Sequence, residues 1–95
     1  MTEHQARLQG DKKRHLEFAG FRFDQVENIE DDNRPKWIVE MPTGAPMKKA
    51  YVRLANALNA AERQINKALF LYRNSIRISD DWQAAIRRYE GYTEL

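Results

Sequence analysis

One apolar stripe constrains the fold of this chain more than any other feature. Its members recur at alternating spacings of three and four residues, the period of a helix that buries one face. They are Tyr51, Leu54, Leu58, Ala61, Ile65, Ala68 and Tyr72. Pro46 suits the first turn of such a helix, because a missing N–H costs no hydrogen bond there. The stripe predicts a helix over about 46–76, roughly 45 Å long, which is long for a chain of 95 residues.

The segment before this helix has the period-2 alternation of a half-buried strand. Leu16, Phe18, Phe21 and Phe23 alternate with polar residues. Ala19-Gly20 shifts the phase by one residue, and we interpret this shift as a bulge or bend within the strand.

A turn and another strand follow. Residues 30–35 combine acidic residues, Asn33 and Pro35, which are typical of a turn. From Lys36 to Met41 the alternation resumes, with Trp37, Val39 and Met41 on one face. Two strands, or three, need a helix to cover their apolar face.

A short second helix is predicted near the C-terminus. Asp80 and Gln83 have the spacing of a capping box, and Gly91 suits a C-terminal cap. The sequence thus predicts an α+β domain over 15–95: an antiparallel β-hairpin or small meander packed on one long helix, plus a short C-terminal helix. We expect residues 1–14 to form a flexible polar arm.

The composition limits the function classes. The chain has no cysteine, which excludes disulfides, thiolate nucleophiles and cysteine-based zinc sites, and favours a reducing, cytoplasmic compartment. The longest apolar run, 68–72, is far too short to span a membrane, and the N-terminus shows no apolar signal segment. We therefore expect a cytoplasmic protein without a membrane partner.

Catalytic patterns are weak. The histidines, His4 and His15, and the serines, Ser75 and Ser79, are not spaced as an activated pair, and there is no glycine-rich phosphate loop. We expect no enzyme activity, no metal and no cofactor. An alternative is a metal-dependent enzyme that uses the carboxylates of 27–32.

Charge is divided unevenly along the chain. Residues 17–41 carry a net charge of −4, whereas residues 45–79 carry +6. The division predicts an acidic hairpin and a basic helix, two surfaces that can each contact a partner. The candidate acidic partner face consists of Glu27, Glu30, Asp31 and Asp32.

The outward face of the long helix is unusual. If Tyr51 takes heptad position a, twelve residues fall on the outward b, c and f positions, and Val52, Ala60 and Phe70 are three of them. The other nine are Arg, Lys or Asn, and none is acidic: Arg53, Asn56, Asn59, Arg63, Asn66, Lys67, Arg73, Asn74 and Arg77. Each asparagine in a helix lowers its stability by about 0.5 kcal/mol relative to alanine. A face that only meets water does not need these asparagines.

Three interpretations of this face compete. It can bind nucleic acid through Arg53, Asn56, Arg63, Asn66, Lys67 and Arg73. It can dock an acidic protein or the acidic hairpin of a second copy, or it can simply be solvated. The apolar stripe also permits a homodimer through the long helix.

Our leading hypothesis is a small interaction module that regulates or inhibits a larger protein partner through charged surfaces. Nucleic-acid binding through the basic Arg/Asn face is the alternative. A short cysteine-free chain without a catalytic constellation is a common profile for accessory proteins of phages and mobile elements.

Overall fold

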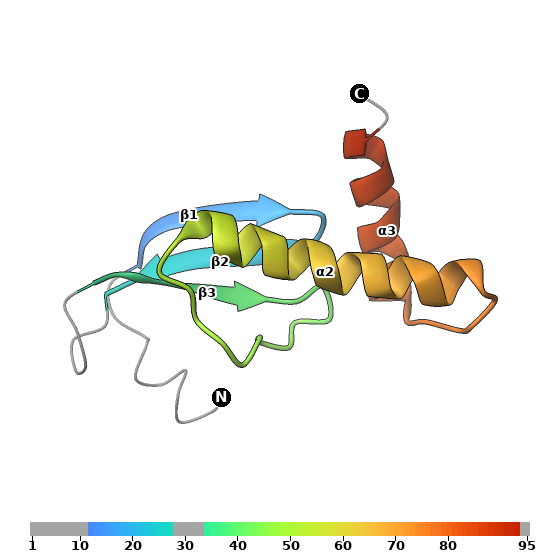
Figure 1. Ribbon diagram of the computed structural model, residues 1–95, viewed down its shortest axis with the longest axis horizontal. Helices are drawn as coiled ribbons and strands as arrows, with labels where there is room; N and C mark the ends of the chain where they lie inside the picture. Colours follow the sequence, from blue (N-terminus) through green and yellow to red (C-terminus); the bar gives the residue numbers. More distant parts are fainter. Residues whose placement is uncertain (1–11, 28–33, 94–95) are drawn as a thin grey trace.

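The computed structural model describes residues 12–27 and 34–93. Three strands precede two helices along the chain: β1 (Lys12–Phe18), β2 (Phe21–Val26), β3 (Lys36–Glu40), α2 (Leu54–Arg73) and α3 (Asp80–Thr93). The strands form an antiparallel sheet in the order β1-β2-β3. Helix α2 lies across one face of the sheet, and α3 is steeply inclined to α2 (Figure 1). The predicted α+β fold is confirmed, and the meander has three strands.

The β1–β2 connection differs from the prediction. Phe18 pairs with Phe21, and Ala19 (φ 49°) and Gly20 (φ 84°) form the two-residue turn between them. Two positive φ values in succession are typical of a type I′ hairpin turn. Such a turn places Phe18 and Phe21 opposite each other on one face, which produces the one-residue phase shift seen in the sequence. The interpretation as a bulge or bend within one strand was therefore wrong. Strand β1 also begins at Lys12, inside the predicted arm, of which residues 1–11 lie outside the described residues.

The segment 46–53 is not helical, contrary to the prediction of a helix from Pro46. It runs along the outer edge of β3, where Glu40 bridges to Pro46 and Trp37 to Tyr51. The Trp37 N–H donates to the Tyr51 carbonyl at 2.6 Å, and the Tyr51 N–H donates back at 3.0 Å. Because these hydrogen bonds satisfy the backbone in an extended form, the helix begins only at Leu54.

The core lies between the sheet and the two helices. The strands supply large side chains, including Trp37, Phe21 and Phe23, which are almost completely buried. Helix α2 supplies mostly small ones: Ala57, Ala60, Ala61, Ile65 and Ala68. Small residues let the helix lie close to the aromatic face of the sheet. The predicted stripe thus identified Ala61, Ile65 and Ala68 correctly, whereas Tyr72 at its end is 51% exposed.

Helix α2 ends in a Schellman motif. Ser75 has a left-handed backbone (φ 61°), and its N–H donates to the Tyr72 carbonyl at 3.1 Å. The Ile76 N–H donates to the Leu71 carbonyl at 2.9 Å. These two bonds are the pair that defines the motif, and they fix where the chain leaves the helix.

The cap of α3 lies one residue earlier than predicted. The Trp82 N–H donates to the Ser79 hydroxyl oxygen at 3.4 Å, so Ser79 rather than Asp80 is the capping residue. The Gln83 side chain donates instead to the Ile78 carbonyl at 3.2 Å. Gly91 lies inside α3, which continues to Thr93, and does not end the helix.

Candidate interaction surface

The face of the sheet that points away from α2 carries charges that pair with one another. Phe21 and Phe23 face the core, so Arg22 and Asp24 point to the other side. His15 Nδ1 lies 2.7 Å from Asp24 Oδ1 on the neighbouring strand. Exposed contacts of this kind add little stability.

A second row of the same face repeats this arrangement. Arg22 lies between Glu17 on β1 and Glu40 on β3, and its nitrogens are 3.8 and 3.9 Å from their carboxylate oxygens. Arg22 is therefore flanked by two carboxylates. The two carboxylates outnumber the one guanidinium, so this row of the sheet is not basic.

The outward face of α2 is different. All nine basic and asparagine residues predicted to form a site are exposed. Six of them lie within α2 at spacings that share one side of the helix: Asn56, Asn59, Arg63, Asn66, Lys67 and Arg73. Arg53 and Asn74 are the residues that flank the helix at its two ends, and Arg77 lies in the α2–α3 loop. Ala60 was grouped with the outward positions wrongly, since it is 3% exposed.

The cations of this face lack acidic partners within the part of the chain that the structure describes. No ion pair there involves Arg63, Lys67 or Arg73. Glu62 is the one acidic residue of α2. Arg63 and Lys67 are also four residues apart, a spacing at which like charges repel. The helix thus presents positive charge that no ion pair compensates within 12–27 and 34–93.

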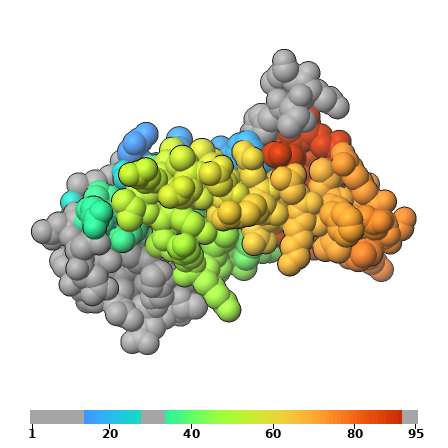
Figure 2. Space-filling view, in the orientation of Figure 1, coloured from blue at the N-terminus to red at the C-terminus, as the bar shows by residue number. Residues whose placement is uncertain are grey.

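An exposed aromatic ring lies on the same side of α2. Phe70 is 65% exposed, although phenylalanine is usually buried. Its neighbours three and four residues away are also exposed: Asn66, Lys67, Arg73 and Asn74. The Asn74 side-chain amide donates to the Phe70 carbonyl at 2.7 Å. Figure 2 shows this part of α2, in orange, forming one end of the molecule. Sequence reasoning placed Phe70 at an outward position but did not include it in the site.

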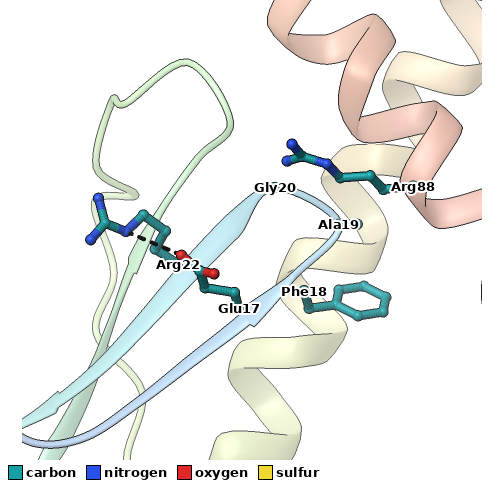
Figure 3. A pocket seen from close by; sticks show the side chains of 6 residues that line it. All are labelled: Glu17, Phe18, Ala19, Gly20, Arg22 and Arg88. Atoms are coloured by element: carbon teal, nitrogen blue, oxygen red, sulfur yellow. Dashed lines mark ion pairs between the residues drawn. The ribbon is translucent and has the colours of Figure 1, made fainter.

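A polar pocket of about 360 Å³ lies where the β1–β2 turn meets α3 (Figure 3). Its lining is Glu17, Phe18, Ala19, Gly20, Arg22 and Arg88. The Arg88 guanidinium lies over the turn, so close that a Cβ added to Gly20 would be 3.4 Å from Arg88 Nη1. Sequence reasoning missed this pocket, because it depends on α3 packing against the turn. One carboxylate and two guanidinium groups, from Glu17, Arg22 and Arg88, give the lining its polar character.

The other predicted features are only partly in view. Glu27 follows β2 and is half-buried, whereas Glu30, Asp31 and Asp32 lie outside the described residues, as does His4. Among the residues that the structure does describe, no group of three His, Asp or Glu side chains is arranged to hold a metal ion. In the same ranges, neither helix is long and apolar enough to cross a membrane.

Comparison with protein-family models, curated proteins and solved structures finds no match to this chain. The exposed surfaces of the sheet and of α2 therefore have to indicate the function. The contrast between Arg22, which two carboxylates flank, and the cations of α2 distinguishes the sheet from the helix.

Proposed function

We propose that this protein is a small non-enzymatic interaction module that docks the outward face of α2 on an acidic surface of a larger protein, and so regulates or inhibits that partner. The observation that carries the proposal is the absence of acidic partners for Arg63, Lys67 and Arg73 among the described residues. Charges left uncompensated on one face steer association toward a surface of opposite sign.

Two further observations favour a protein as the partner. Phe70 places an aromatic ring among these cations, and aromatic residues together with arginine are enriched in protein–protein interfaces. The four asparagines add side chains that both donate and accept hydrogen bonds. A module without catalytic groups acts on its partner by covering a surface. The absence of cysteine suits a partner in the cytoplasm.

A second candidate function is nucleic-acid binding. It is favoured by the alternation of Arg or Lys with Asn along α2, because the cations suit phosphate and asparagine suits adenine. The residues that would carry it are Arg53, Asn56, Arg63, Asn66, Lys67 and Arg73. This alternative predicts an affinity that falls linearly with the logarithm of the salt concentration.

The test measures binding by fluorescence anisotropy, with labelled poly-glutamate as a surrogate for an acidic protein and a labelled mixed-sequence duplex and single strand as nucleic acids. The wild type is compared with Arg63→Glu/Lys67→Glu. The control, Lys48→Glu/Arg87→Glu, changes the net charge equally at exposed residues outside α2. We expect the α2 variant to weaken poly-glutamate binding at least about tenfold, or about 1.4 kcal/mol, and the control to have a much smaller effect.

The outcomes separate the candidates. If both variants weaken binding equally, net charge alone is responsible and the proposed site is wrong. If the wild type binds a nucleic acid but not poly-glutamate, and the α2 variant loses that binding, the second candidate is correct. If the wild type binds neither kind of probe at low salt, both candidates fail.

A further inference from the structure

Phe70 is placed where the fold itself cannot bury it. It follows Ala68, a core residue, by two positions, which is about 200° around the helix. The sheet and α3 contact the side of α2 that carries Ala57, Ala61, Ile65 and Ala68. Any movement of α2 that covered Phe70 would therefore expose the core. The second half of α2 also extends past the ends of the strands (Figure 1), where it has solvent on the side of Phe70.

The neighbours of Phe70 limit what can cover it. Lys67 and Arg73 lie three residues before and after it, and neither has an ion-pair partner among the described residues. An antiparallel pair of α2 helices centred on Phe70 would place Lys67 of each copy opposite Arg73 of the other. A parallel pair would place Lys67 opposite Lys67, and Arg73 opposite Arg73, of the other copy. Both arrangements bring like charges together, which argues against a second copy of this chain.

We infer that Phe70 is the apolar anchor of the α2 interface, and that the occupant is an acidic protein segment with an apolar pocket or apolar side chains bordered by carboxylates. This inference rests on the proposed function and adds the chemistry of the partner. Lys67 and Arg73 pair with the carboxylates, while the ring leaves water. An aromatic anchor ringed by polar contacts is the usual organisation of an interface hot spot. Burial of a phenylalanine corresponds to about 10- to 100-fold in affinity.

The experiment compares two labelled probes that differ in apolar content: poly-glutamate and a random copolymer of glutamate and tyrosine. Anisotropy titrations use the wild type, Phe70→Ser and Tyr72→Ser. Tyr72 is the matched control, because it is a 51% exposed aromatic residue near the same helix end but on another side of α2. Circular dichroism confirms that each variant is folded.

We expect the wild type to bind the copolymer about 10- to 100-fold more tightly than poly-glutamate. Phe70→Ser should reduce this preference to near unity without changing the affinity for poly-glutamate. Tyr72→Ser should leave most of the preference in place.

Other results overturn the inference in distinguishable ways. If the wild type binds the two polymers equally well, Phe70 is not an anchor. The same conclusion follows if Phe70→Ser leaves the preference for the copolymer unchanged. In both cases the proposed function still holds. Failure to bind either polymer removes the proposed function together with the inference. A concentration-dependent mass in sedimentation equilibrium that Phe70→Ser abolishes would identify a second copy as the occupant instead.

Discussion

Replacing Ser75 with glycine should stabilise this protein. Ser75 is exposed and has a φ of 61° at the end of α2. A left-handed backbone costs a residue other than glycine about 1–2 kcal/mol. Glycine also increases the entropy of the unfolded chain, which opposes folding by about 0.4–1 kcal/mol. The difference is a net stabilisation of about 0.5–1 kcal/mol, or about 2–8 °C in Tm for a domain of this size.

The assay is urea unfolding followed by far-UV circular dichroism, with an unchanged m-value as evidence that the unfolded state is comparable. Asn74→Gly is the matched control at the adjacent residue. Asn74 has a φ of −96°, so glycine relieves no strain there, and the substitution removes the 2.7 Å hydrogen bond to the Phe70 carbonyl. We expect Asn74→Gly to be less stable than the wild type. If Ser75→Gly is no more stable than the wild type, the strain argument is refuted.

Two further substitutions test the core and the hairpin turn by the same assay. Ile65→Ala removes the largest fully buried side chain of α2 and should destabilise the protein by about 2–5 kcal/mol; a loss below about 1 kcal/mol would contradict its place in the core. Gly20→Ala should cost about 1 kcal/mol or more, because φ is 84° and a residue with a Cβ is strained in a left-handed backbone. The same change at Gly91, which has open space around it inside α3, should preserve or raise stability, and equal losses at the two glycines would count against this explanation.

The sequence predicts the fold class well because hydrophobic periodicity reflects burial directly. Ala61, Ile65 and Ala68 follow the period of a helix and are buried as that period requires. The start of α2 could not be predicted in this way. Pro46 and Tyr51 fit a helical pattern, but hydrogen bonds to β3 hold them in an extended segment. Those bonds depend on the position of a strand several residues earlier, which local periodicity does not contain.

The candidate surface could likewise be predicted only in part, because periodicity along one helix does not tell which strands are neighbours. Exposure of the six residues that lie within α2 follows from helix geometry, and all nine residues predicted to form the site are exposed. The position of Arg22 between two carboxylates of the sheet does not follow from the period of one strand. Whether Arg22 meets Glu17 and Glu40 depends on the strand register, and the register depends on the two-residue turn at Ala19-Gly20, which sequence reasoning interpreted as a bulge.

The segment after β3 has a consequence for how this protein can assemble. Residues 46–51 occupy the outer edge of β3, where the Met47 N–H donates to the Val39 carbonyl and Trp37 exchanges two bonds with Tyr51. These bonds occupy backbone groups of β3 that an uncovered edge strand would offer to another chain. A second copy can therefore add a strand to β3 only by displacing residues 46–51, which disfavours edge-to-edge association there.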